Sequence, residues 1–160
     1  LLPQMDGLTR IFARNCSTRR ISRETAGAFL RENHRLGDTR CRYLYGLFVS
    51  RAGRDGIPVG TLVAVAGFSS ARKWEKDGKT VRSYEWVRYA SLRGTGINGG
   101  MGKMLKTFIG EVHPDDVMSY ADASWSSGDV YKKLGFREEE PKIFPDGSRS
   151  LKFRLKLSEY

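Results

Sequence analysis

The sequence predicts an α/β fold with a mixed β-sheet, antiparallel in its first part and parallel around a glycine-rich helix, and with helices on both faces. The stretch from Tyr84 to Phe136 reads as strand, glycine-rich turn, helix, strand and short helix, an order that favours parallel pairing. Two β-rich segments precede it and are joined by a turn-rich connection, which is typical of an antiparallel hairpin. With 160 residues and no repeats, we expect a single domain over residues 1–160.

The first part of the chain is expected to hold one strand and one helix. Residues 9–17 alternate loosely between apolar and polar side chains and predict a strand. Ser22 is a good helix N-cap, and the apolar side chains that follow recur at helical spacing. We therefore expect a helix that ends near Asn33, followed by a loop at residues 34–38, where glycine and aspartate favour a turn.

The antiparallel part of the sheet is predicted from two segments rich in β-branched and aromatic residues, Tyr43–Ser50 and Val59–Phe68. Residues 51–58 between them are rich in glycine and aspartate and predict a hairpin connection. The polar and basic residues 69–80 predict a loop or a hairpin tip. The next strand is expected at Val81–Leu92.

The second half begins with a helix expected from about Gly99 to Glu111. The later elements are expected in this order: a strand at Val117–Ala121, a short helix capped by Ser126 or Ser127 and ending at Leu134, and strands near Phe136–Glu140 and Leu151–Leu157. Gly135 is placed to end the short helix in the left-handed conformation. The Asp146-Gly147 pair predicts a turn between the last two strands.

The chain is strongly basic, with a formal net charge of +10 from 28 Lys and Arg against 18 Asp and Glu. Much of the excess lies early, at Arg10, Arg14, Arg19, Arg20, Arg23, Arg31, Arg35, Arg40 and Arg42. A second basic run lies next to Trp74, at Arg72, Lys73, Lys76 and Lys79. Such a field attracts polyanions, so DNA or RNA is one candidate partner. A solvated basic surface and a dock for an anionic cofactor are the open alternatives.

The two cysteines, Cys16 and Cys41, have neither metal-site spacing nor a disulfide framework. We therefore expect a reducing, intracellular, cytoplasmic location and no metal site. No apolar run is long enough to span a membrane, and the start LLPQMDGLTR lacks the layout of a signal peptide. The chain has no initiator Met, which leaves a trimmed N-terminus open.

The glycine-rich turn that opens the central helix predicts an anion site. The first backbone N–H groups of a helix have no partner within the helix, and the helix dipole favours negative charge there. Glycines are too dense in this segment for an ordinary helix start, since glycine lowers helix stability. A phosphate-bearing ligand is expected to contact Asn98, Gly99, Gly100, Met101, Gly102 and Lys103.

The order of elements, with GMGKML opening the central helix and VYKKLGF closing the next one, resembles the GCN5-related N-acetyltransferase (GNAT) superfamily. In that family a Gln/Arg-x-x-Gly-x-Gly/Ala segment wraps the pyrophosphate of acetyl-CoA. Gly100-Met101-Gly102 matches the glycines, and Lys103 stands where a basic residue usually follows. Ile97 stands where the family has Gln or Arg, so the chain departs from the pattern there.

The resemblance spans roughly residues 43–136 and implies the GNAT fold, acetyl-CoA or another acyl-CoA as cofactor, and transfer of the acyl group to an amine-bearing substrate. A narrower likeness is to phage GNAT-like domains and Mom-type DNA-modification proteins. It rests on His34, Arg88 and the segment Tyr120-Ala121-Asp122. It implies modification of a nucleic-acid base, with His34, Arg88 and Asp122 in the site. A non-catalytic DNA-binding module is the third reading.

The resemblance also implies a role for Tyr131, because a Tyr near the start of the last short helix protonates the leaving thiolate in GNAT enzymes. The alternative is that Tyr131 packs under this helix with its hydroxyl hydrogen-bonded. Glu85 on the central strand is a candidate general base. Arg88 is a candidate for binding a phosphate or carboxylate through its planar guanidinium. An ion pair that only stabilises the fold is the alternative for both.

His34 lies in a polar loop after the first helix and is a candidate general base, or a residue that only caps the helix. Asp122 follows an apolar strand and could orient His34 or an amine, or cap the next turn. Tyr120 and Trp125 are expected to bind substrate, Trp125 by stacking or by lining a pocket. His113, before Pro114, is expected to be structural.

Overall fold

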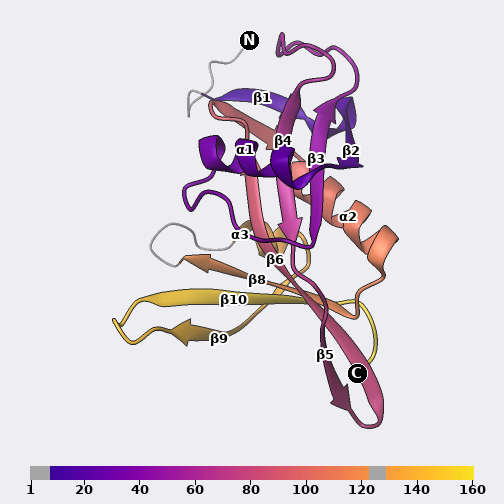
Figure 1. Ribbon diagram of the computed structural model, residues 1–160, viewed down its shortest axis with the longest axis vertical. Helices are drawn as coiled ribbons and strands as arrows, with labels where there is room; N and C mark the ends of the chain where they lie inside the picture. The colour runs from indigo at the N-terminus through magenta and orange to yellow at the C-terminus, as the bar shows by residue number, and fades with distance from the viewer. Residues whose placement is uncertain (1–7, 123–128) are drawn as a thin grey trace. The chain divides into compact units, whose positions relative to one another are not determined.

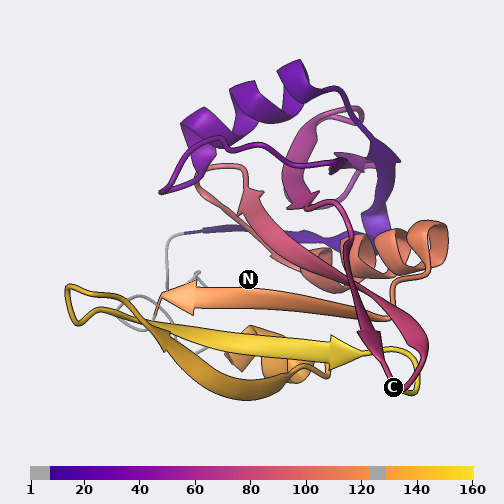
Figure 2. The ribbon, with the colours of Figure 1, turned by 60° about the horizontal axis from the view of Figure 1, so that its bottom comes forward.

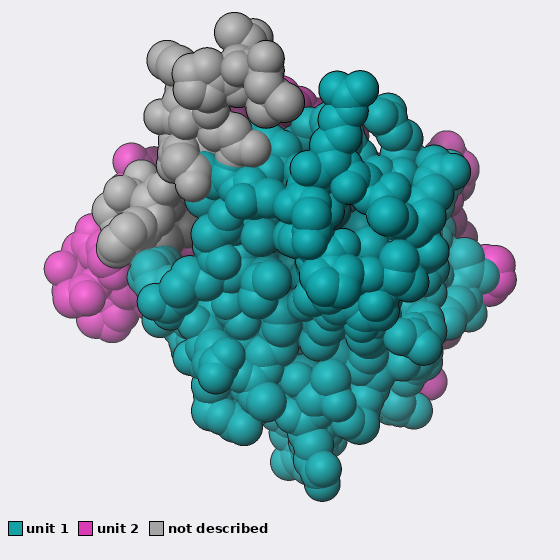
Figure 3. All heavy atoms as spheres, turned by 90° about the horizontal axis from the view of Figure 1, so that it is seen from above, with its two compact units in different colours: residues 1–68, 88–112 teal, residues 69–87, 113–160 magenta. Residues whose placement is uncertain are grey.

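The computed structural model describes residues 8–122, of which Asp122 is described by its backbone alone, and 129–160. The chain forms two compact units, and each unit is assembled from two segments of the chain (Figure 3). Unit 1 comprises Leu1–Phe68 and Arg88–Val112, and unit 2 comprises Ser69–Val87 and His113–Tyr160. The strand β6 (Lys79–Ser91) contributes residues to both. The expected single domain stays a prediction.

In unit 1, three antiparallel strands follow the order β2 (Cys16–Arg20), β3 (Tyr43–Val49) and β4 (Leu62–Phe68). The predicted hairpin between β3 and β4 is confirmed. The strand β4 begins three residues later than predicted because Gly60 has a φ of +93° and the chain turns at Pro58, whose carbonyl accepts the N–H of Thr61 at 3.2 Å. Where β6 ends, the N–H of Leu92 donates to the carbonyl of Val63 at 2.7 Å.

The continuous strand predicted over residues 9–17 is wrong. The structure has a short strand β1 (Thr9–Phe12), a 3₁₀ turn η1 (Ala13–Asn15) and then β2. The strand β1 pairs in parallel with β7 (Thr95–Asn98), which lies inside the glycine-rich turn and was not expected as a strand. Partners far along the sequence, which a local pattern does not reveal, cause this break.

Two helices lie on opposite faces of β3 and β4 in unit 1, as predicted (Figures 1 and 2). The helix α1 (Arg23–Asn33) is capped by Ser22, whose Oγ accepts the N–H of Thr25 at 3.1 Å. The helix α2 (Gly100–Val112) buries Phe108. The ring of Phe108 stacks on Phe68 with centroids 3.9 Å apart and planes at 1°. This aromatic contact anchors α2 on β4.

In unit 2, β6 continues a hairpin that starts at β5 (Arg72–Lys76). The turn residues Asp77 and Gly78 both have positive φ, which is the type I′ pattern that matches strand twist. Three residues of β6 pair in parallel with the start of β8 (Asp116–Asp122), which confirms the parallel part of the sheet. The last strands, β10 (Arg149–Lys156) and β9 (Arg137–Ile143), complete the order β6-β8-β10-β9 in this unit.

The short helix α3 (Asp129–Lys133) ends one residue before the predicted Leu134, and Gly135 has the predicted left-handed conformation, with a φ of +96°. Its predicted caps, Ser126 and Ser127, lie outside the described residues. The turn at Gly147 is also confirmed, with a φ of +86°. Over the part of the chain that the structure describes, no helix is long and apolar enough to cross a membrane.

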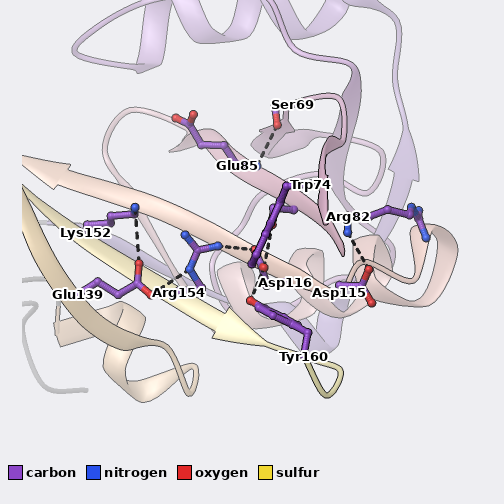
Figure 4. Close-up of polar contacts among 11 residues, drawn as sticks. Ser69, Trp74, Arg82, Glu85, Asp115, Asp116, Glu139, Lys152, Arg154 and Tyr160 are labelled. Carbon is purple, nitrogen blue, oxygen red and sulfur yellow. Dashed lines mark hydrogen bonds and ion pairs between the residues drawn. The ribbon is translucent and has the colours of Figure 1, made fainter. Parts of the chain in front are cut away.

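A buried carboxylate organises the polar contacts of unit 2 (Figure 4). Asp116 is completely buried, and its oxygens accept from Arg154 at 2.8 Å, from Ser83 at 2.8 Å and from the hydroxyl of Tyr160. Arg154 also donates through Nε to Glu139 at 3.0 Å. A buried charge is tolerated only when it is paired and hydrogen-bonded in this way.

We expect Asp116→Ala to lower the free energy of unfolding by about 3–5 kcal/mol, because it leaves the donors around this carboxylate without their acceptor. Tyr160→Phe removes one hydrogen bond and should cost about 1 kcal/mol. Glu140→Ala changes an exposed carboxylate and should stay within about 0.5 kcal/mol. Urea unfolding followed by circular dichroism measures all three, and equal effects of Asp116→Ala and Glu140→Ala would contradict the buried network.

Candidate functional site

The start of α2 is shaped by two glycines with different constraints. Gly99 has a φ of +80°, a conformation that glycine adopts without a steric penalty. Gly100 is buried, and a Cβ there would lie 2.9 Å from the hydroxyl of Tyr89 and 2.9 Å from Cγ2 of Ile97. Glycine is therefore required at position 100 because the protein's own side chains pack against its backbone.

The helix start has the features of an anion site. The first turn of α2 contains no acidic residue, and the first N–H groups of a helix have no partner inside it. The predicted cofactor residues form one continuous segment here: Asn98 at the exposed end of β7, Gly99, and then Gly100, Met101, Gly102 and Lys103 in the first turn. The dipole of α2 and the free backbone N–H groups of its first turn together favour the binding of a phosphate here.

Lys103 is held by the protein itself. Its ammonium donates to the carbonyl of Ala13 at 2.9 Å and to the carbonyl of Cys16. Ala13 is the first residue of the 3₁₀ turn η1, and Cys16 directly follows that turn as the first residue of β2. Burial raises the pKa of the Cys16 thiol, and the nearby Lys103 lowers it by less. The thiol of Cys16 therefore stays protonated at neutral pH and is a poor nucleophile.

The departure from the family pattern at Ile97 also has a structural counterpart. Ile97 lies in β7, where it pairs with Ile11 of β1. Its side chain packs on Gly100, as the 2.9 Å approach of Cγ2 to a Cβ built at that position shows. At this position the chain therefore uses an apolar contact within unit 1, where a Gln or Arg would present a hydrogen-bond donor.

Tyr131 is half-buried among aromatic rings of unit 2. Its ring stacks on Phe153 at 5.2 Å with the planes at 22°, and it meets the rings of Phe136 and Trp86 edge-on at 5.4 and 6.3 Å. Burial raises the pKa of the Tyr131 hydroxyl above its usual value of 10. The phenol is thus protonated throughout the neutral range, as a proton donor must be.

Ser119 can donate its single proton either to Tyr131 or to the carbonyl of Trp86, and this choice sets the direction of the hydrogen bond that Tyr131 makes. The Oγ of Ser119 lies 3.0 Å from the carbonyl oxygen of Trp86 and 2.9 Å from the hydroxyl oxygen of Tyr131. A hydroxyl has one proton, and a carbonyl can only accept. When Ser119 donates to Trp86, Tyr131 therefore donates to Ser119. The predicted alternative, a packed Tyr131 with a bonded hydroxyl, is the arrangement that the structure has.

Ser119 is not among the site residues predicted from the sequence. It is a buried polar residue in the apolar strand β8. The last residue pair between β6 and β8 is Glu85 with Met118, and Ser119 directly follows Met118. The signal that could have found it is a single hydroxyl at an inward position of a parallel strand, because such a group needs a partner.

Glu85 is paired within unit 2. Its carboxylate lies 3.2 Å from the guanidinium of Arg72, and its own N–H donates to the Oγ of Ser69 at 2.9 Å. The carboxylate keeps one-fifth of its side-chain surface exposed. The ion-pair alternative considered for Glu85 is therefore present, and Arg72 is the partner.

The structure brings His34 and Arg88 together in unit 1. Arg88 donates through Nε to the carbonyl of Gly37 at 3.1 Å and so holds the loop that begins at His34. Burial lowers the pKa of His34, and the charges of Arg88 and Arg35 lower it further. Nδ1 of His34 accepts the N–H of Leu36 at 2.9 Å. The neutral ring therefore carries its proton on Nε2, which makes it a donor.

Of the remaining predicted residues, Tyr120 lies near the end of β8 and His113 directly after α2. The ring of Tyr120 lies 5.9 Å from the ammonium of Lys142. The backbone of Asp122 pairs with Ser150, but its side chain and the whole of Trp125 lie outside the described residues. His113 follows α2 with a φ of 52°, and its carbonyl accepts from Arg82 at 3.2 Å, which is a structural role. No His, Cys, Asp or Glu cluster that could hold a metal occurs in residues 8–121 and 129–160.

No protein-family model and no curated protein sequence matches this chain. Solved structures do. An aminoglycoside N(6')acetyltransferase from Legionella pneumophila has a TM-score of 0.57 and 14% identity, covering 89% of this chain and 92% of that one. FeeM, an N-acyl amino acid synthase from uncultured soil microbes, has a TM-score of 0.56 and 12% identity, covering 88% of this chain and 90% of that one. A GNAT-family acetyltransferase from Bacillus anthracis has a TM-score of 0.55 and 13% identity, covering 89% of this chain and 95% of that one. The chain therefore has the fold of GNAT acetyltransferases, as the sequence predicted.

Two glycines of α2, Gly100 at its start and Gly110 near its end, allow a matched test of the packing at the start of this helix. We expect Gly100→Ala to lower the free energy of unfolding by about 1–3 kcal/mol, because its methyl group collides with Tyr89 and Ile97. Gly110→Ala meets open space in the same helix and should raise it by about 0.5–1 kcal/mol. Urea unfolding of both variants checks this, and equal signs for the two changes would refute the packing argument.

Proposed function

We propose that this chain transfers an acyl group from acetyl-CoA or another acyl-CoA to an amine-bearing acceptor. The observation that supports it best is the protonated Tyr131, on the short helix after β8, in a chain with the GNAT fold. Similar structures include an aminoglycoside N(6')acetyltransferase and an N-acyl amino acid synthase. Both names describe acyl transfer to nitrogen, although these proteins share only 14% and 12% of their residues with this one.

The proposed cofactor residues are those at the start of α2. Backbone N–H groups of Gly100, Met101 and Gly102 would bind the pyrophosphate, with the helix dipole adding to the attraction. Lys103 would contribute positive charge from its place on the carbonyls of Ala13 and Cys16. When bound, acyl-CoA supplies an activated thioester. The donors fit its anionic part because no carboxylate opposes them in the first turn.

The proposed proton donor is Tyr131. As the amine nitrogen bonds to the acyl carbon, the carbon–sulfur bond breaks and the departing thiolate needs a proton. Tyr131 can give its proton to sulfur only after releasing it from Ser119. Rotation of the Ser119 hydroxyl does this, because Ser119 then donates to Tyr131 in place of Trp86. Ser119 is therefore proposed as a positioning residue for Tyr131.

The acceptor side is proposed from the other predicted residues. Glu85, held by Arg72, would take the proton that the amine loses. The Nε2–H of His34 and the guanidinium of Arg88 would bind an oxygen of the acceptor. Tyr120, Asp122 and Trp125 would complete the contacts with it. Modification of a nucleic-acid base, and a DNA-binding module without activity, stay predictions that nucleoside mass spectrometry of exposed DNA distinguishes from acyl transfer to other amines.

Isothermal titration with acetyl-CoA tests the cofactor site. We expect saturable binding that Met101→Glu weakens at least tenfold, because the new carboxylate lies in the first turn and repels the pyrophosphate. The fold should tolerate this change, since an anion at a helix N-terminus is favourable. The charge-matched control Gly110→Glu, near the other end of α2, should leave the affinity unchanged. Absence of binding, or equal effects of the two variants, would overturn the proposed site.

Steady-state kinetics test the proton donor. Tyr131→Phe keeps the aromatic packing and should lower kcat by about 10²–10⁴-fold with little change in KM. When Ser119 donates to Tyr131, this hydrogen bond lowers the pKa of Tyr131; Ser119→Ala removes it, so the alkaline limit of the kcat profile should move to higher pH. The ultraviolet titration of tyrosine should shift in the same direction. A normal kcat for Tyr131→Phe would show that this residue only packs.

A further inference from the structure

The positive charge of this protein is concentrated in one of its two units. Unit 1 contains 15 Lys and Arg against 6 Asp and Glu, a formal charge of +9. Unit 2 contains 13 Lys and Arg against 12 Asp and Glu, a formal charge of +1. Charge excess confined to one part of a molecule produces a directed field that attracts a polyanion to that part.

Four exposed arginines of unit 1 lie over aromatic rings. The distances from the guanidinium carbon to the ring centroid are 4.7 Å for Arg14 over Phe12, 3.9 Å for Arg19 over Phe48, 5.2 Å for Arg20 over Tyr43 and 5.0 Å for Arg42 over Tyr43. None of the four forms an ion pair with another described residue. Their positions are fixed by the rings, and their charges remain available to a ligand.

These arginines border the strand β2, which is the last strand in the order β2-β3-β4 and therefore an edge. Arg19 and Arg20 end β2, and Arg42 directly precedes β3. Arg20 and Arg42 share the ring of Tyr43. At the other end, Arg14 lies in the turn before β2. The five residues of β2 span about 13 Å at about 3.3 Å per residue.

Arg51 extends the same edge at the start of β2. Its Nε donates to the side chain of Asn15 at 2.7 Å, next to Arg14 in the sequence. Asp55 acts electrostatically on Cys16, and Glu111 acts on Tyr45. Neither forms an ion pair with these arginines. The arginine edge is defined as Arg14, Arg19, Arg20, Arg42 and Arg51, and none of its members forms an ion pair with another described residue.

We propose that the arginine edge binds single-stranded nucleic acid. Guanidinium groups bind phosphates in pairs of hydrogen bonds, and several along one strand match a polyphosphate backbone. The rings beneath them are partly accessible: Phe12 is 39% exposed, and Tyr43 and Phe48 are intermediate. Unpaired bases stack on such rings and on guanidinium planes, whereas bases inside a duplex cannot. This binding is independent of the proposed acyl transfer.

Fluorescence anisotropy with a labelled 20-nucleotide single strand of mixed sequence tests the proposal, at salt concentrations from 50 to 300 mM. Arg20→Ala/Arg42→Ala should raise Kd on the order of tenfold and lower the slope of log Kd against log salt by about 1.4, the value for two lost phosphate contacts. Arg20→Lys/Arg42→Lys keeps the positive charge but loses the planar guanidinium group on which a base can stack. Kd should therefore rise, while the slope of log Kd against log salt should stay unchanged.

The control removes two positive charges from unit 2, with Lys133→Ala/Arg149→Ala, both exposed, and should leave Kd within about twofold at 150 mM salt because neither residue belongs to the arginine edge. Thermal unfolding confirms that each variant is folded. Four outcomes would overturn the proposal: no binding at 50 mM salt, an equal effect of the control, tighter binding of the matching duplex, or displacement by polyglutamate or by CoA. The last two competitors would identify an acidic protein or a nucleotide cofactor as the occupant.

Discussion

The contact between the Lys103 ammonium and the carbonyls of Ala13 and Cys16 determines how unit 1 is arranged. In the 3₁₀ turn the carbonyl of Ala13 already accepts the N–H of Cys16, and a carbonyl oxygen has a second lone pair. Lys103, in the first turn of α2, donates to this oxygen as well and to the carbonyl of Cys16. On the other side of the turn, β1 pairs with β7. Because β7 leads directly into Gly99 and α2, one interaction positions both the first strands and the start of the central helix.

This constraint changes how an anion can be bound there. The lysine that the family pattern assigns to the cofactor is occupied by the fold, so backbone N–H groups and the dipole of α2 must provide most of the attraction. Tyr89 and Ile97 close the space over Gly100, which keeps the backbone of the turn in one conformation. A rigid set of donors loses little entropy when a ligand binds.

Local chemistry made much of the fold predictable. The Ser22 cap, the left-handed Gly135 and the turn at Gly147 each depend on neighbouring residues, and all three are present. The short strand β1 ends at Phe12, and its partner β7 lies far along the sequence, at Thr95–Asn98, which no local pattern contains. The same limit applies to the site. Tyr131 could be proposed from its motif, whereas Ser119 has a proposed role only because β8 brings it to Trp86 and Tyr131.

The two units use similar numbers of cations in different ways. In unit 2, Arg154 forms ion pairs with Asp116 and Glu139 (Figure 4), and Arg72 forms one with Glu85. These arginine charges are compensated by carboxylates of the same unit. In unit 1, Arg19 and Arg20 lie over rings that fix their planes but do not neutralise them. Mutual repulsion among these arginines disfavours the free protein. A bound polyanion relieves that repulsion, so the feature that costs stability in isolation favours association.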